Sequence, residues 1–206
     1  MDELLPALAN RRARRAFTSE PVAAVSEGLL WRAVAVAPSH GNTQPARVLI
    51  ARSAEIRSAL LAALSEGNRG WASAAPLLFA LAVIPTHDTP QANSDGTTRE
   101  LWAFHGGIAA ANLMAQATAL GLIAHPMASF DEVAARAAFG VPPDARIVVI
   151  FAVGYPGEPE SLAEDLRARE TMSQDRLPPE HFVAEDTWTA ALELSARDFR
   201  KRRTES

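Results

Sequence analysis

The chain has 206 residues, of which 48% are hydrophobic and 21% are charged, and its formal net charge is −4. These values are typical of one globular domain, and they exclude general disorder and a broad affinity for nucleic acid or anionic membranes. The absence of cysteine excludes disulfides, thiolate metal ligands and a cysteine nucleophile, and it agrees with a cytoplasmic protein.

The sequence predicts neither a signal peptide nor a membrane-spanning helix. The longest apolar stretch, residues 74–84, is shorter than the roughly 18 residues that a spanning helix needs, and it contains Pro76. The first fifteen residues have no apolar run of signal-peptide length. We therefore expect no membrane partner, no nucleic-acid partner and no bound metal.

Helices and two strands are predicted before residue 85. Ser26 and Ser53 are typical helix N-caps, and Pro38 should end the helix that Ser26 begins. The apolar run 77–84 is typical of a strand that is covered on both faces. The predicted elements are helices over residues 3–10, 27–36 and 54–64, and strands over residues 48–51 and 77–84.

The second half predicts one long helix, then shorter elements and a polar arm. Residues 85–98 are polar and turn-rich, which predicts a mobile loop. The segment from about Arg99 to Leu120 is apolar nearly all round, as in helices buried in a core or a large subunit interface, and Gly121 suits its end. The remaining elements are a helix over 131–139, a strand over 146–153, a short helical piece in the arm, and a last helix over 187–200.

Together these elements predict an α+β fold with few strands and much helix. We expect a single domain over residues 1–206, in which residues from about 155 to 206 form a polar C-terminal arm and a terminal helix.

The first chemical motif is a cluster of four arginines, Arg11, Arg12, Arg14 and Arg15, within five residues. Their guanidinium groups repel one another, and the cluster becomes favourable when a multivalent anion lies among them. Arginine forks match phosphate oxygens two at a time, so a phosphate is a suitable anion. Taken alone, however, a solvated basic face is the commoner explanation of such a cluster.

The second motif is the polar loop Ala-Pro-Ser-His-Gly-Asn-Thr-Gln-Pro over residues 37–45. It follows a predicted helix and precedes a predicted strand. Ser39, Asn42 and Gln44 offer hydrogen-bond donors and acceptors that would suit a neutral ligand edge such as a pyrimidinedione. Taken alone, this loop is more simply explained as an ordinary polar turn.

Three further motifs follow along the chain. Residues 67–71 place Asn68 and Trp71 ahead of the buried strand, and Trp71 is interpreted as a packing residue. Residues 121–130 cross a short extended segment, whose small side chains would let the backbone approach a flat ring. His125 in that segment is interpreted as a core histidine with a satisfied hydrogen bond. Gly-Tyr-Pro at residues 154–156 comes last, with a basic residue further along.

In this order the five motifs resemble the nitroreductase family, with matching segments from about Arg11 to Pro179. The resemblance implies a three-layer α/β/α sandwich with a small, mainly antiparallel sheet. It also implies an interleaved, obligate homodimer with two FMN sites at its interface, and an enzyme of the NAD(P)H-dependent nitroreductase type.

The resemblance also implies roles for the matching residues near the amino end. Arg11 and Arg12 would hold the FMN phosphate, and Arg176 would return to it. Arg15 would lie near the pyrimidine end of the ring. Ala13 also falls in the binding segment, where it replaces the usual serine and removes a hydroxyl contact.

Other segments would complete the implied site. Asn68 would bond the isoalloxazine edge, Met127 would contribute to the binding segment, and the amides of Ala128 and Ser129 would face the ring nitrogen that exchanges hydride. The residues that would reach the flavin from the partner subunit are Pro38, Ser39, His40 and Asn42.

Two further departures from the family pattern concern affinity and substrate choice. Ala46 stands where a bulky aromatic residue often follows Gln-Pro, so the neighbouring pocket would be wider. Trp71 stands where some members carry a lysine near the ring, which would leave Arg15 as the cation there.

The implied reaction is a ping-pong reduction. NAD(P)H would reduce the flavin, and a nitroaromatic, quinone or similar electron-poor acceptor would then oxidise it. Arg15 would stabilise the charge of the reduced flavin, so Arg15→Ala should lower the reduction potential. The sequence assigns no side-chain general acid and leaves roles for His40 and His125 open, as it does the choice between NADH and NADPH.

Three alternatives remain at this stage. The first is a flavin-binding store, sensor or partner-dependent subunit without NAD(P)H turnover. In such a protein NAD(P)H would not bleach the absorbance of the bound flavin. The second is a related flavin enzyme that dehalogenates its substrate or fragments flavin, and it is less favoured because residues 85–98 lack an aromatic or basic lid signature. The third is an α+β domain without a cofactor.

Overall fold

The computed structural model describes residues 4–172 and 175–205, without the side chains of residues 202–205. It divides into two compact units, Met1–Glu170 and Thr171–Ser206, which are described separately below. The prediction of a single domain over residues 1–206 stays a prediction.

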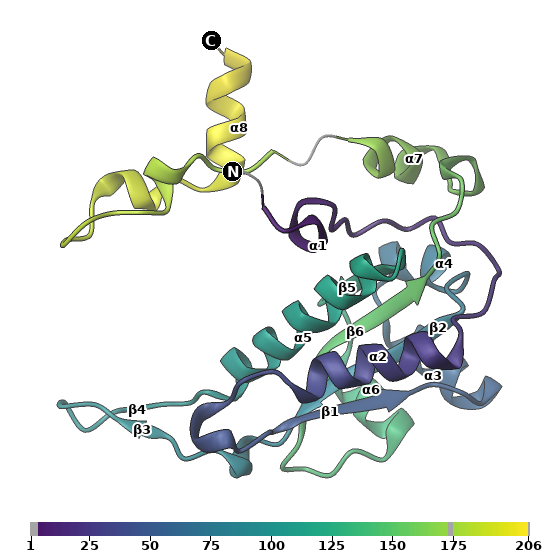
Figure 1. Ribbon diagram of the computed structural model, residues 1–206, viewed down its shortest axis with the longest axis horizontal. Helices are drawn as coiled ribbons and strands as arrows, with labels where there is room; N and C mark the ends of the chain where they lie inside the picture. The colour runs from purple at the N-terminus through teal and green to yellow at the C-terminus, as the bar shows by residue number, and fades with distance from the viewer. Residues whose placement is uncertain (1–3, 173–174, 206) are drawn as a thin grey trace. The chain divides into compact units, whose positions relative to one another are not determined.

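The first unit is built on a four-stranded antiparallel sheet with the strand order β1-β2-β6-β5 (Figure 1). The strands are β1 (Ala46–Ile50), β2 (Leu77–Val83), β5 (Ile123–Met127) and β6 (Arg146–Gly154). Every residue of β2 is buried, as its apolar run predicted. The edge strand β5 was predicted only as an extended segment, and its Pro126 is compatible with an edge because proline cannot donate a ladder hydrogen bond.

Helices cover both faces of this sheet, which confirms the predicted three layers. Side chains alternate along a strand, so Phe79 of β2 joins one core cluster and its neighbour Ala80 joins the other. Helices α2 and α5 contribute to the first cluster and lie side by side in Figure 1, whereas α3, α4 and α6 contribute to the second. The helices are α2 (Ala24–Ala35), α3 (Ala54–Ala63), α4 (Glu66–Ala72), α5 (Trp102–Ala119) and α6 (Glu132–Phe139).

The long apolar helix is confirmed as α5, although it begins at Trp102 rather than near Arg99. Gly106 lets α5 lie close to the sheet, because a Cβ there would be 3.0 Å from a methyl carbon of Val148. After the helix Gly121 has a φ of +72°, a left-handed conformation that suits glycine. Phe104, on another side of α5, is 64% exposed. The buried face of this helix therefore accounts for only part of its apolar surface.

The helix caps were partly predicted from the sequence. Ser53 caps α3, with its Oγ accepting a hydrogen bond from the Ile56 amide at 3.2 Å. The prediction of Ser26 as a cap is wrong, since α2 begins at Ala24 after the N-cap residue Ala23. Alanine favours helix strongly enough that α2 begins before any side-chain cap. The first helix is also shorter than predicted, with α1 spanning Pro6–Ala9.

We expect Ser53→Ala to lower the free energy of unfolding by about 1 kcal/mol, because it leaves the Ile56 amide without its cap. Urea denaturation of the two proteins measures this difference. Ser58→Ala is the matched control, since Ser58 is exposed within the same helix, and alanine there should be neutral or slightly stabilising. Equal losses in the two variants would contradict the capping role.

The segment after β2 contains structure that the sequence did not predict. Residues Pro85–His87 form a 3-10 turn, η2, and strands β3 (Gln91–Ala92) and β4 (Thr98–Arg99) form a small hairpin. Asp88 follows η2 and is buried, although the segment as a whole is polar. The mobility expected for residues 85–98 stays a prediction.

The rest of the chain is irregular, with short helical segments. The expected helical piece is α7 (Glu164–Thr171), which begins after the turn η3 (Pro159–Ser161). The second unit contains η4 (Pro179–His181), η5 (Ala190–Glu193) and α8 (Ala196–Glu205). The last helix was predicted from residue 187, but it begins where Ser195 Oγ accepts a hydrogen bond from the Asp198 amide. Within the described residues, no helix has the length and apolar character that crossing a bilayer demands.

Candidate active site

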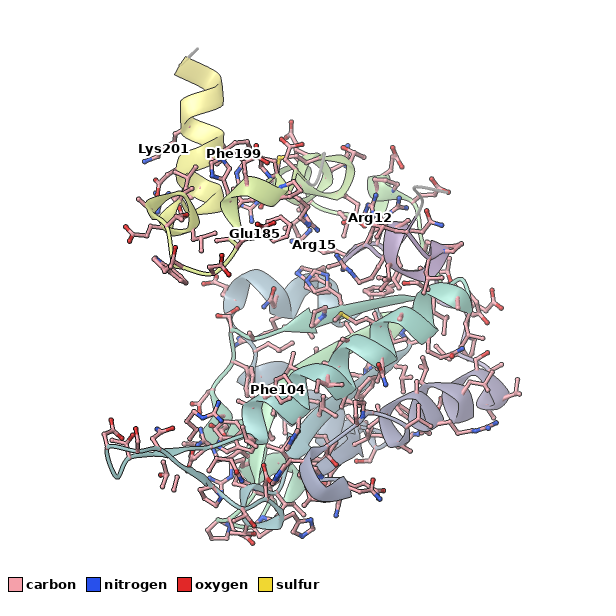
Figure 2. The ribbon with its side chains drawn as sticks, turned by 60° about the vertical axis from the view of Figure 1, so that its left-hand side comes forward. Arg12, Arg15, Phe104, Glu185, Phe199 and Lys201 are labelled. Atoms are coloured by element: carbon pink, nitrogen blue, oxygen red, sulfur yellow. The ribbon has the colours of Figure 1, made fainter. Side chains whose placement is uncertain are left out.

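The basic segment after α1 has two different faces. Side-chain exposure alternates along it, with Arg12 and Arg14 exposed and Arg11, Ala13 and Arg15 half-buried. Such alternation is expected of an extended backbone, whose side chains point to opposite sides in turn. Figure 2 shows Arg12 and Arg15 on this segment. The segment therefore presents guanidinium groups to two sides.

Arg12 and Arg14 line a hollow of about 190 Å³ beside the turn that ends α5. The Arg12 guanidinium donates hydrogen bonds to the carbonyl oxygens of Ala9 and Arg11, at 2.8 and 2.9 Å. No carboxylate of a described residue lies within ion-pair distance of Arg12 or Arg14. This hollow consequently has positive charge available for an anion.

Arg15 has an acidic neighbour that the sequence did not reveal. Its guanidinium lies 3.8 Å from a carboxylate oxygen of Glu170, whose side chain is only 3% exposed. The backbone amides of Arg15 and Ala16 donate hydrogen bonds to the same carboxylate, at 2.8 to 3.1 Å. Because Glu170 occupies these amides, the guanidinium is the donor that Arg15 can offer to a ligand.

The ring of Trp71 packs near the guanidinium group of Arg15. The Arg15 guanidinium carbon lies 5.9 Å from the centre of the Trp71 ring, and Trp71 in turn contacts His125 at 4.4 Å between ring centres. Trp71 is buried and also stacks against Phe17, which confirms its interpretation as a packing residue. A cation close to an aromatic face is stabilised by the quadrupole of the ring.

His125 is a buried core histidine, as predicted. Its Nδ1 lies 2.8 Å from the carbonyl oxygen of Arg14, so this nitrogen carries the hydrogen and donates it. Burial lowers the pKa of His125 to about 4, against the opposing effect of the Arg14 hydrogen bond. The ring is therefore neutral near pH 7, and its one N–H is held by the Arg14 carbonyl oxygen.

The end of β5 lies beside the start of α4. The Ser65 amide donates a hydrogen bond to the carbonyl oxygen of Ser129 at 3.1 Å, and Asn68 follows within the first turn of α4. Met127 has a buried side chain, whereas Ala128 and Ser129 are exposed. Since Trp71 links α4 to Arg15, the structure brings Arg15, Asn68 and the backbone after β5 into one region.

The polar loop lies at the other end of α5. The 3-10 turn η1 (His40–Asn42) contains left-handed backbone, and the His40 amide donates a hydrogen bond to His105 Nε2 at 3.1 Å. Thr118, near the opposite end of α5, lines the hollow of Arg12. At 1.5 Å per residue, the separation from His105 to Thr118 is about 20 Å along the helix. Within one chain, the predicted site residues therefore form two distant groups.

Ala46 and Arg176 are the two remaining positions that the sequence analysis singled out. Ala46, the first residue of β1, lines a hollow of about 310 Å³ together with Trp31 and Pro38, and the wider pocket expected there stays a prediction. Arg176 belongs to the second unit, and its contact with a phosphate stays a prediction.

Comparison with known proteins identifies the family. The model of the nitroreductase family matches residues 8–80 and 63–155, which together are more than half of the chain. The chain belongs to the nitroreductase family. A Streptomyces coelicolor protein whose name includes NADH dehydrogenase and NAD(P)H nitroreductase is 30% identical to this nitroreductase family member over 73% of the chain and 82% of its own length. A similarly named Stenotrophomonas maltophilia protein is 32% identical over 73% and 83%.

Solved structures agree with this assignment. One that is described as an oxidoreductase containing FMN aligns with a TM-score of 0.79 and 26% identity, covering 91% of this chain and 93% of that one. A nitroreductase family protein of Clostridium difficile has a TM-score of 0.71 and 23% identity, covering 90% and 100%. The chain is therefore an oxidoreductase with the nitroreductase fold.

Proposed function

We propose that the chain is an FMN-dependent oxidoreductase that uses NAD(P)H to reduce nitroaromatics, quinones or similar electron-poor acceptors. The observation that carries the proposal is the basic segment: Arg12 and Arg14 on one face have no acidic partner among the described residues, and Arg15 on the other face lies near Asn68 and the small residues after β5. An anionic tail attached to a flat, hydrogen-bonding ring fits this combination.

The residues present fit FMN, each by its chemistry. Arg11 and Arg12 hold the phosphate, and Ala13 leaves room beside it without adding a hydroxyl contact. Arg15 supplies positive charge to the ring. Asn68 and the backbone after Met127 supply hydrogen bonds to its edges. FMN provides the chemistry of hydride exchange, while the protein positions it and excludes competing reactions.

We also propose a homodimer that shares its sites. Pro38, Ser39, His40 and Asn42 lie about 20 Å along α5 from the Arg12 hollow, so they complete a site only if a second copy supplies them. A two-fold axis would bring the loop of each copy to the basic segment of the other. The exposed Phe104 and an open groove of about 460 Å³ between α1, α2 and α5 offer apolar surface for such an interface.

In this dimer the reaction is ping-pong. FMN would supply the hydride exchange, with NAD(P)H and the acceptor using the same place in turn. The open space beside Ala46 favours acceptors that are wider than those tolerated by members with an aromatic residue there.

The test is the absorbance spectrum of the purified protein, before and after anaerobic addition of NADH or NADPH. We expect a flavin spectrum that bleaches with at least one of them and returns when nitrobenzene or benzoquinone is added. A colourless protein that takes up no FMN from excess would refute the proposal. Bound flavin that neither nucleotide bleaches would instead identify a flavin-binding protein without turnover.

Sedimentation of the flavin-loaded protein tests the shared site separately. We expect a dimer with one FMN per chain. A monomer that retains FMN would show that one chain suffices to bind it, which contradicts the contribution of residues 38–42 from a partner.

A further inference from the structure

A buried carboxylate joins two histidines at the amino end of α5. Asp88, whose side chain is 4% exposed, has one carboxylate oxygen 3.3 Å from His40 Nδ1. Its other oxygen lies 3.4 Å from Nδ1 of the buried His105, without good hydrogen-bond geometry. The Thr89 amide also donates to Asp88, at 3.0 Å. Two of the five histidines thus face one carboxylate, although the three residues are far apart in the sequence.

The hydrogen bond that His105 accepts determines which of its ring nitrogens carries the hydrogen. Its Nε2 receives the His40 amide at 3.1 Å, so this nitrogen carries no hydrogen. The ring hydrogen therefore lies on Nδ1, which faces Asp88. A second proton on His105 would remove the acceptor of the His40 amide. His105 consequently holds the backbone of His40 in place.

His40 is the member of this cluster that reaches the outside. Its side chain is 50% exposed, and its Nδ1 faces Asp88. No described residue forms a hydrogen bond with its Nε2. Gly41 and Asn42 follow with φ values of +57°, so the turn is held in an unusual conformation. When both ring nitrogens carry a hydrogen, Asp88 balances the charge and Nε2–H is the outward donor.

We propose that His40 is the proton donor to the electron acceptor, and that Asp88 and His105 position it. This inference rests on the proposed function, in which the loop of residues 38–42 reaches the cofactor of the second subunit. His125 is unsuitable as this proton donor, because it is buried and neutral near pH 7.

The proton balance of nitro reduction requires such a donor. Converting a nitro group to a nitroso group breaks one N–O bond and consumes two electrons and two protons, releasing water. A hydride equivalent, which originates from NAD(P)H, supplies both electrons and one of the protons. The Nε2–H of His40 supplies the other proton to the departing oxygen, and solvent then reprotonates the ring.

The decisive experiment compares two acceptors in His40→Gln. Nitrobenzene needs protons, whereas ferricyanide takes up one electron and no proton. We expect reoxidation by nitrobenzene to slow by about 100-fold relative to reoxidation by ferricyanide, as is typical when a general acid is removed. Stopped-flow absorbance measures both rates at saturating FMN, together with the rate of reduction by NADH or NADPH.

Two variants separate proton donation from a structural role. Imidazole added to His40→Gln should restore part of the nitrobenzene rate, because it replaces the missing donor. Asp88→Asn keeps the size of the side chain but removes its charge, and it should slow nitrobenzene reduction more than ferricyanide reduction. His87→Gln is the matched control, since His87 is an exposed histidine beside Asp88, and all its rates should equal those of the wild type.

The outcomes are distinguishable. If the wild type binds no FMN or is not reduced by either nucleotide, the proposed function fails and this inference fails with it. If the wild type turns over but His40→Gln reduces nitrobenzene at the normal rate, only the proton-donor role is refuted. Equal slowing with nitrobenzene and ferricyanide would also refute it, because such a loss indicates a damaged site.

Discussion

Replacing Gly157 with alanine is expected to lower the free energy of unfolding by about 3 kcal/mol, the upper end for overpacking a tight site. A Cβ at this position would lie 2.6 Å from the carbonyl carbon and 2.7 Å from the carbonyl oxygen of Phe17. Both are backbone atoms, so no flexible side chain can move aside. Urea denaturation of the cofactor-free protein, at one fixed protein concentration, measures the loss.

Gly28→Ala is the control for this prediction. Gly28 lies inside α2, where an added Cβ meets no atom within 4 Å. Alanine there should stabilise the protein by up to about 1 kcal/mol, because glycine has a poor helix propensity. If both substitutions had similar effects, the close approach at Gly157 would not be a packing constraint.

The contacts around Gly157 also hold the basic segment of the active site in place. The Gly157 amide donates a hydrogen bond to Ala16, and the Thr18 amide donates one to Tyr155. The chain after β6 is thereby attached to the segment that directly follows Arg15. The Gly-Tyr-Pro motif is therefore explained by the placement of the basic segment, and no direct ligand contact is needed to account for it.

Elements whose own sequence favours them were predictable. β2 is a continuous apolar run, and α6 has Asp131 as its N-cap and Gly140 with a φ of +63° at its end. By contrast, α4 contains Gly67 and Gly70, which disfavour helix in isolation. Its Trp71 is buried against Phe17, so tertiary packing overrides the local preference.

The candidate site was predictable only where its residues are neighbours in the sequence. The arginine cluster and the loop of His40 were visible as motifs. Glu170 is separated from Arg15 by 155 positions, and no local pattern indicates that they meet. His105 carried one usable signal, as an ionisable residue within a largely apolar helix. Its partner Asp88 lies in a polar segment, where an aspartate is expected and its burial cannot be predicted.

The pairing of Arg15 with Glu170 leads to a second prediction, in which substitutions of these two residues shift the reduction potential of FMN in opposite directions. Reduced FMN carries more negative charge than oxidised FMN, so a nearby positive charge favours the reduced form. Arg15→Ala is therefore expected to lower the reduction potential by about 30 mV or more, which for two electrons equals about 1.4 kcal/mol. Glu170→Gln removes the opposing negative charge and should raise the potential.

The choice of variants separates charge from structure. Glutamine at residue 170 retains an oxygen that can accept the amides of Arg15 and Ala16, so the segment should keep its position. Arg15→Lys retains the positive charge and should restore most of the potential. Arg14→Ala is the control, because Arg14 is exposed on the other face of the segment.

The measurement is a redox titration of each variant at saturating FMN, so that weaker cofactor binding does not enter the result. If the reduction potential falls in Arg15→Ala and rises in Glu170→Gln, both charges must act on the same redox centre. Structural damage would not explain why the two potentials shift in opposite directions. An unchanged potential in Arg15→Ala would place the guanidinium too far from the ring to matter. The buried Glu170 carboxylate would then serve only to anchor α7 to the basic segment.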